Sequence, residues 1–195
     1  MLPESNAAKR NALALAGLRI AVGSLFLIFA QYKVLGTHFT LGGGFQFWIN
    51  RFLQDGEAYP FMIPVLQRFV LAHATAIAFI VAYGELAIGV ALVFGAAVRA
   101  ASVFGLLYML GLLFSSNYPG AHVALWQYFG ASLDHSVLAL CFLTFFTSRS
   151  EELLSVRGLL KLRQEAVSTP SAAVTCASNA GELDRGSSQG VSRNT

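Results

Sequence analysis

Charge is scarce in this chain. Only 12% of its 195 residues are Asp, Glu, Lys or Arg, whereas 55% are hydrophobic and the mean hydropathy is +0.60. Soluble domains carry roughly 25% charged residues, so this balance excludes an ordinary soluble domain and predicts an all-α integral membrane protein. The few Lys and Arg residues form no basic face, so we expect no nucleic-acid partner.

Reactive motifs are also missing. The two cysteines, Cys141 in an apolar run and Cys176 in a polar tail, are poorly placed for a disulfide. The sequence has no CxxC or CxxCH motif, no P-loop and no GxSxG, which excludes the thiol-redox, haem, nucleotide and serine-hydrolase classes that use them. No His–x3–His or His–x2–Glu pair occurs, and we predict no metal site.

What the chain does contain is long apolar runs. A membrane-spanning helix needs about 20 apolar residues, and four segments approach that length: 12–32, 71–94, 100–116 and 128–147. The first run is too long for the core of a cleavable signal peptide, so we expect an uncleaved span. The sequence therefore predicts one four-helix membrane bundle over residues 12–148, after an N-terminal tail at 1–11. In the cytoplasmic tail predicted at 149–195, a polar helix-like segment runs to about residue 164, and we expect the rest, which lacks periodicity, to be mostly disordered.

A shorter amphipathic segment lies between the first two spans. In residues 43–55 the apolar side chains recur at helical spacing, with polar residues on the other face. The segment is too short to cross a bilayer, which favours a helix lying in the membrane interface. The alternative is a helix that packs as a cap over the mouth of the bundle, and the two interpretations do not exclude each other.

The placement of Lys and Arg predicts the orientation. With four spans, both termini and the turn near residue 97 lie on one side, and that side carries most of the basic residues. Cytoplasmic loops are enriched in Lys and Arg, so we expect both termini in the cytoplasm and the chain in the cytoplasmic (inner) membrane.

Two charges of opposite sign interrupt the spans. Arg19 lies in the first apolar run and Glu85 in the second. Counting 1.5 Å per residue from the cytoplasmic ends places them about 10 Å and 14 Å deep, which predicts that they meet. A buried charge at this depth usually faces the bundle interior or a water-filled cavity. The pair either fixes helix register or takes part in chemistry, by binding a polar head group or relaying protons.

A second candidate set lies toward the opposite, outward side. His73, Asp134 and His135 fall in the outward half of the predicted topology. Imidazole titrates near neutral pH and can hydrogen-bond a quinone carbonyl, so these residues are candidates for a proton or quinone entrance. Aromatic residues at the span ends fit either an interfacial belt or a quinone pocket, and the sequence does not separate the two.

The ordered residues carry a family resemblance. The first span holds Leu18, Arg19 and Gly23 and ends at Lys33, and the second and third carry the run Gly84, Glu85, Gly89, Leu92, Gly95 and Arg99. Over residues 18–146 this arrangement resembles the DoxX-like membrane family, which includes the DoxD-type subunit of thiosulfate:quinone oxidoreductase. Ala30 departs from the pattern, since the family often has glycine before the lysine of the first span, and the tail lies outside the resemblance.

The resemblance implies a four-helix membrane protein of a respiratory or sulfur-oxidising system. The expected function is a membrane subunit of a quinone-linked oxidoreductase, with quinone as cofactor and a partner subunit or a second copy as partner. Glu85 and Arg19 would form the polar core, and Arg99 would hold the quinone at the interface. Two alternatives stay open: a non-enzymatic scaffold or assembly partner, and a small-solute permease. The permease is less favoured because the spans show no inverted repeat or broken-helix pair.

Overall fold

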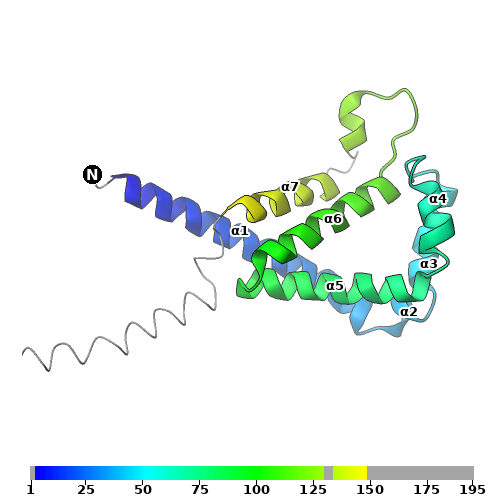
Figure 1. Cartoon of the computed structure of the whole chain (residues 1–195), viewed down its shortest axis with the longest axis horizontal. Helices are drawn as coiled ribbons and strands as arrows, with labels where there is room; N and C mark the ends of the chain where they lie inside the picture. Colours follow the sequence, from blue (N-terminus) through cyan, green and yellow to red (C-terminus); the bar gives the residue numbers. More distant parts are fainter. Residues whose placement is uncertain (1–2, 130–133, 149–195) are drawn as a thin grey trace, which may run out of the picture. The chain divides into compact units, whose positions relative to one another are not determined.

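The computed structural model describes residues 3–129 and 134–148, which form helices joined by turns and loops, with no strand among them (Figure 1). The elements in chain order are α1 (Pro3–Val34), α2 (Thr37–Thr40), α3 (Gly44–Gln54), α4 (Ile63–Val65), the π-helix η1 (Leu66–Val70), α5 (Ala74–Phe94), α6 (Val98–Ser116), the 3₁₀-helix η2 (Leu125–Phe129) and α7 (Asp134–Thr147). The predicted all-α class is confirmed. The predicted disordered tail lies outside the described residues.

Three of these helices are long and apolar enough to cross a membrane: residues Arg10–Val34 of α1, then α5 and α6. Their positions match the first three predicted spans, although α1 begins at Pro3 and α6 includes Arg99. The fourth helix begins later than predicted, because residues 125–129 form η2 and α7 starts at Asp134. With 14 residues, α7 is about 21 Å long, shorter than a hydrocarbon core of about 30 Å.

A tight turn joins α5 to α6. Gly95 has a left-handed backbone (φ 67°) and its N–H donates to the carbonyl of Ala91, as does the N–H of Ala96. Glycine adopts this conformation without steric cost and is the usual residue after a helix end. The chain therefore reverses within three residues, and α5 and α6 form an antiparallel hairpin (Figure 1).

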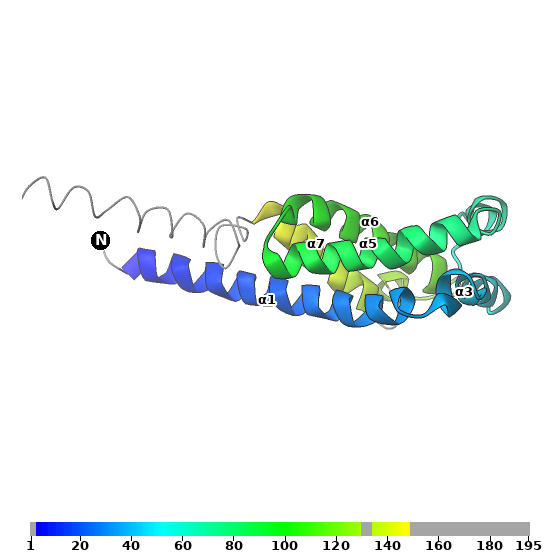
Figure 2. The same cartoon turned by 90° about the horizontal axis from the view of Figure 1, so that it is seen from below.

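Helix α1 runs beside α5 in the opposite direction (Figure 2). Glycines set how closely the two pack: a Cβ added at Gly89 would lie 2.8 Å from the Leu27 side chain and 3.0 Å from the Gly23 carbonyl oxygen. The register pairs Gly23 with Leu92 and Leu27 with Gly89. Continuing along both helices brings the last turn of α1 to the middle of α5, which positions the candidate site.

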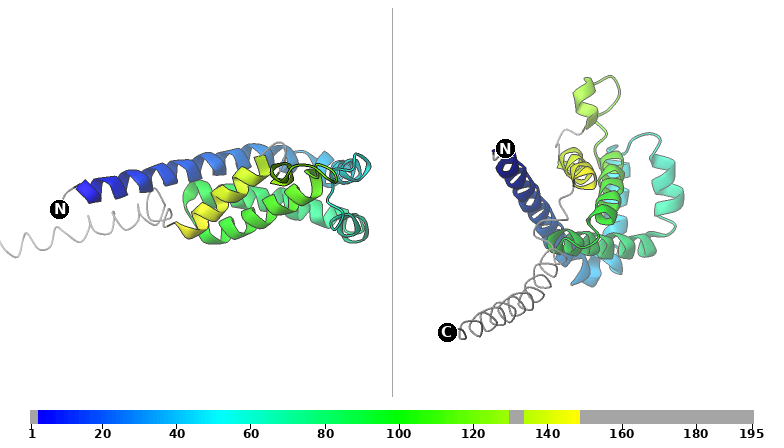
Figure 3. Two further views of the ribbon diagram at one scale, coloured as in Figure 1. Left: turned by 90° about the horizontal axis from the view of Figure 1, so that it is seen from above. Right: turned by 60° about the vertical axis from the view of Figure 1, so that its left-hand side comes forward.

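Helix α7 packs mainly against α6, as α1 packs mainly against α5 (Figure 3). The ring of Phe142 occupies the space where Gly105 has no side chain, and it meets Phe26 of α1 edge to face at 5.3 Å between ring centres. The buried core of these four helices consists of Val22, Phe26, Ile88, Leu92, Val98, Ala101, Met109, Ala139, Phe142 and Phe145.

Helix α3 confirms the predicted helix near residues 43–55. Phe45 and Ile49 are buried against Leu66, Ala74 and Ala78, forming a second apolar cluster. On its outer surface Phe47 and Trp48 are exposed. The helix therefore packs on the start of α5, as the cap interpretation requires, while its outer aromatic face leaves the interfacial placement a prediction.

The end of α6 is fastened to the segment after α3. The N–H of Tyr59 donates to the carbonyl of Phe114, and the N–H of Tyr118 donates to that of Glu57. The Tyr59 hydroxyl donates to the carbonyl of Tyr128 at 2.6 Å. These bonds hold the entry to α4 against the chain that leaves α6.

Candidate functional site

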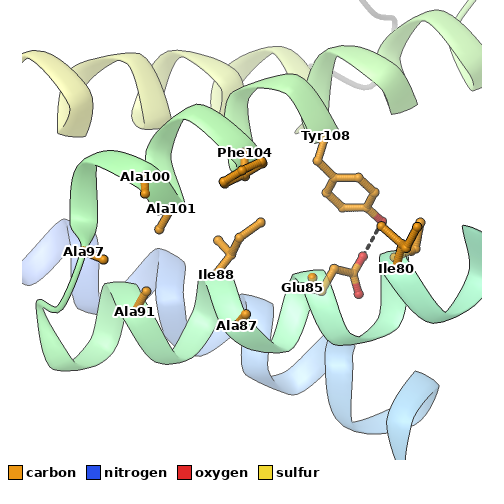
Figure 4. Close-up of a pocket in the computed structure, with 12 residues that line it drawn as sticks. Ile80, Glu85, Ala87, Ile88, Ala91, Ala97, Ala100, Ala101, Phe104 and Tyr108 are labelled. Carbon is orange, nitrogen blue, oxygen red and sulfur yellow. Dashed lines mark hydrogen bonds between the residues drawn. The ribbon is translucent and has the colours of Figure 1, made fainter.

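One carboxylate joins three helices. Lys33 lies in the last turn of α1, Glu85 in the middle of α5 and Tyr108 in α6. The Lys33 ammonium is 2.5 Å from Oε1 of Glu85, and the Tyr108 hydroxyl donates to the same oxygen (Figure 4). Lys33 Nζ also lies 3.5 Å from the Tyr108 hydroxyl. We call these three residues the Glu85 cluster.

The Glu85 cluster is largely buried in the protein. The side chain of Glu85 is 6% exposed and that of Lys33 is 25% exposed. An ionised carboxylate in such surroundings needs a paired charge and hydrogen bonds, and Lys33 with Tyr108 supplies both to Oε1. The Lys33 ammonium also stands 5.2 Å from the centre of the Phe39 ring, within the range of a cation–π contact.

A cavity of about 510 Å³ adjoins the cluster. Its size falls in the range of small-molecule and cofactor sites, which are mostly apolar with a few placed polar groups. The aromatic part of the lining comes from α1, α2 and α3 and consists of Phe26, Phe29, Phe39, Phe45, Trp48 and Phe52. The polar part consists of Lys33, Glu85, Tyr108, Asp134 and His135. We call this space the aromatic cavity.

His135 stands on the wall of the aromatic cavity with a defined hydrogen-bond geometry. Its Nδ1 is 3.1 Å from Oδ1 of Asn117, and that oxygen also accepts a bond from the Ser116 hydroxyl. Because Oδ1 can only accept, this contact favours the His135 tautomer that carries its proton on Nδ1. Asp134 Oδ1 lies 3.3 Å from the same nitrogen and accepts the backbone N–H of His135. Nε2 of His135 can then accept a proton, and it donates once the ring is charged.

Glu85 and Tyr108 also line a second hollow, a groove of about 350 Å³ between α5 and α6 (Figure 4). The rest of this lining is apolar, and most of it is glycine and alanine. Val81, Glu85 and Tyr108 are common to the linings of both hollows. The Glu85 cluster therefore stands between the aromatic cavity and the α5–α6 groove.

The structure corrects the partner that the sequence assigned to Glu85. Arg19 and Glu85 are both buried, with 0% and 5% exposure, but Glu85 pairs with Lys33. Lys33 lies fourteen residues after Arg19 on α1, a distance of about 21 Å along the helix axis. The register of Gly23 against Leu92 places Arg19 near the α5–α6 turn. The depth count failed because it assumed that both helices start at the same membrane level.

The other predicted site residues separate into two groups. Asp134 and His135 line the aromatic cavity together with Glu85. His73 lies elsewhere, just before α5, where Nδ1 meets the Phe69 carbonyl at 3.0 Å and the imidazole lies against the Phe69 ring. Arg99 is exposed in the first turn of α6, nine residues before Tyr108, and lines neither the cavity nor the groove.

Two cluster residues were not identified from the sequence. Lys33 ends an apolar run, a position from which a lysine usually reaches the interface, and Tyr108 resembles a belt residue. The sequence nevertheless holds one feature that points to each of these two residues. Lys33 is a second cation for the buried Glu85, and Tyr108 lies within the third apolar run rather than at its end.

Comparisons of the chain with protein-family models, with curated proteins and with solved structures give no match. The resemblance to the DoxX-like family therefore stays a prediction from residues 18–146. In the described part of the chain, no group of three His, Cys, Asp or Glu side chains is arranged to hold a metal ion.

Proposed function

We propose that this chain is a DoxX-like protein of the cytoplasmic membrane that binds a quinone in the aromatic cavity. It would act as a membrane subunit of a quinone-linked oxidoreductase, of the thiosulfate:quinone type in the relatives that it resembles. One observation carries the proposal: Lys33, Glu85, Tyr108 and His135 stand on the wall of one aromatic-lined cavity of about 510 Å³. Such a cavity offers a flat ring both stacking surfaces and polar partners for its carbonyls.

The chain's own residues suit this role. The Lys33 ammonium has three N–H donors; Glu85 and Tyr108 take two of them, so the third can reach a carbonyl oxygen. His135 supplies a second donor when its ring is charged, and on returning a proton it keeps Nδ1 bonded to Asn117. Glu85 and His135 could therefore pass protons at the two ends of the head group. A bound quinone would supply the two-electron acceptor, with electrons arriving from the donor through a partner subunit.

The proposed membrane arrangement completes this picture. Helices α1, α5 and α6 would cross the bilayer, and α7 would make a fourth crossing with the help of residues on either side of it. Helix α3 would lie at the outward interface, with Phe47 toward the lipid and Trp48 at the edge of the aromatic cavity. Both termini would then be cytoplasmic, and the aromatic cavity would open near the outward face.

Tryptophan fluorescence tests the binding site. Trp48 lines the aromatic cavity, whereas Trp126 lies on the exposed η2 segment. In a Trp126→Phe variant in mild detergent, decylubiquinone should quench Trp48 with saturation. The matched Trp48→Phe variant, which keeps Trp126, should show only linear collisional quenching. His135→Ala should raise the dissociation constant about tenfold, the effect of losing one hydrogen bond to a charged donor.

The reaction needs a separate measurement. Protein purified from its native membrane should carry extractable quinone and, with its co-purifying partners, reduce quinone in a thiosulfate-dependent manner. A folded sample that contains no quinone and shows no saturable quenching would overturn the proposal.

The scaffold alternative is favoured by one observation, the Lys33–Glu85 bond between α1 and α5. A double variant, Lys33→Met with Glu85→Met, distinguishes a scaffold role of the ion pair from a role in the quinone reaction. If it folds and keeps quinone-dependent activity, the ion pair is structural.

A further inference from the structure

The α5–α6 groove has the shape of a site for a chain-like molecule. Its floor consists of small residues from both helices: Gly84, Ala87, Ala91, Ala97, Ala100 and Ala101. Ile80 and Phe104, which are 70% and 65% exposed, form its rim (Figure 4). In a membrane these exposed side chains would face lipid, so the groove would be open to the hydrocarbon of the bilayer.

Glu85 is the groove's one charged residue, and one of its oxygens lacks a donor. Lys33 and Tyr108 both bond to Oε1. Oε2 is buried and accepts no hydrogen bond from the described part of the chain. In Figure 4 this oxygen points away from Tyr108. A buried acceptor without a partner is costly, so a molecule that brings a donor to Oε2 gains affinity there.

The charge at the site selects the kind of donor. The Lys33 ammonium already balances the Glu85 carboxylate at 2.5 Å, so a second cation would bring an excess positive charge into an apolar site. An anion would be repelled by the carboxylate. A neutral hydroxyl group supplies the donor without either cost, and an alkyl chain fits the alanine floor.

We propose that the α5–α6 groove binds a neutral lipophilic alcohol, whose hydroxyl donates to Oε2 of Glu85 and whose alkyl chain runs toward Ala97. Oε2 is shielded in the absence of the ligand, so the hydroxyl must reach it by displacing the side chains that cover it, while Oε1 keeps its bonds to Lys33 and Tyr108. The inference goes beyond the quinone reaction: it uses the same carboxylate, but the ligand would lie in the other hollow that Glu85 lines.

Bromine quenching of a tryptophan placed in the groove tests the proposal. The reporter is Phe104→Trp in the full chain with Trp48→Phe and Trp126→Phe, reconstituted in phosphatidylcholine vesicles. The probes are 11-bromoundecanol and its methyl ether, compared at equal mole fractions in the bilayer. We expect saturable quenching, with the alcohol binding about tenfold more tightly because only the alcohol donates to the carboxylate.

Two variants with matched controls complete the test. Glu85→Gln replaces one acceptor oxygen by a donor nitrogen, and the preference for the alcohol should fall below twofold. Ala87→Phe fills the groove from an exposed position and should abolish saturation, while Val90→Phe, also exposed on α5 but outside the groove lining, should not. If Glu85→Gln does not fold, the comparison of Ala87→Phe with Val90→Phe still tests whether the alcohol binds in the groove.

Equal affinity of the alcohol and the ether in the reporter protein would overturn the proposal. So would tighter binding of 11-bromoundecylamine than of the alcohol, or a preference that survives Glu85→Gln. Quinone quenching of Trp48 is measured on a different tryptophan and in a different hollow, so failure here leaves that result intact.

Discussion

Lys33 and Glu85 lie 52 positions apart in the chain, yet their side chains meet at 2.5 Å and tie the end of α1 to the middle of α5. The pair is asymmetric, because the carboxylate is nearly buried while a quarter of the lysine side chain is exposed. Replacing Lys33 therefore has a different effect on stability from replacing Glu85. Loss of the ammonium leaves a buried carboxylate with only the Tyr108 hydroxyl.

Lys33→Met should lower the free energy of unfolding by up to about 3 kcal/mol, the lower part of the range for a broken buried pair, since Lys33 is partly exposed. Adding Glu85→Met should restore much of the loss, because it removes the uncompensated charge. Unfolding by SDS in mixed micelles gives both values. Asp55→Ala, which breaks the exposed Arg51–Asp55 pair at the end of α3 without removing the Arg51 contact to Trp48, is the control and should cost under about 0.5 kcal/mol. A double variant no more stable than Lys33→Met would contradict this account.

Gly105→Ala should destabilise the bundle by about 1–3 kcal/mol, because the new methyl group would overlap the Phe142 ring and force α7 away from α6. Gly111→Ala on the same helix is the matched control. A Cβ there meets nothing within 4 Å, and the change should stabilise the helix by up to about 1 kcal/mol. Thermal unfolding in detergent measures both. Equal effects of the two substitutions would show that α7 does not press on Gly105.

The membrane crossing of α7 can be tested with single cysteines. In a background with Cys141→Ser and Cys176→Ser, we expect Asn11→Cys and Ser148→Cys to be protected from an impermeant maleimide in intact cells. Both should react after lysis. Ala121→Cys, in the exposed loop after α6, is the control and should react from outside. Labelling of Ser148→Cys in intact cells would mean that α7 turns back without crossing.

Tyr59 should ionise at higher pH than an ordinary tyrosine. Burial, with smaller contributions from Tyr128 and Tyr118, raises the pKa of the Tyr59 phenol above 10. A raised pKa means that the folded state holds the proton more tightly than the unfolded state. Its contribution to stability is complete below about pH 10 and is lost as the pH rises through the folded-state pKa. The difference between the ultraviolet titrations of the wild type and Tyr59→Phe isolates this phenol. A midpoint at or below 10 would contradict the expectation.

Much of the fold followed from local sequence patterns. Long apolar runs predicted α1, α5 and α6, and Gly95 marked the end of α5 because a left-handed residue is needed there. The burial of Glu85 followed from its neighbours alone. The start of α7 did not follow, because the polar and aromatic residues before it are compatible with either a helix or a loop.

The partner of Glu85 depended on information that local patterns do not carry. The register of α1 against α5 is set by the close contact of Gly23 and Gly89, which shifts Lys33 toward Glu85 and Arg19 toward the turn. A lysine at the end of an apolar run can extend to the interface or fold back into the bundle, and only tertiary packing decides between these. The sequence placed His135 in a set apart from Glu85, so it did not predict that the two residues line the same cavity.

The hydrogen bonds that fasten Tyr59 to Phe114 and Tyr118 to Glu57 divide the segments at this end of α6 into a fixed part and an adaptable part. Beyond Tyr118 the chain passes through Gly120 and His122, both with left-handed backbone, into exposed residues. Foreign sequence should therefore be accommodated between residues 121 and 124, and not between 57 and 62. That short stretch is a practical place for an epitope or a rigid fiducial domain, which would give a protein of this size the mass that single-particle imaging requires.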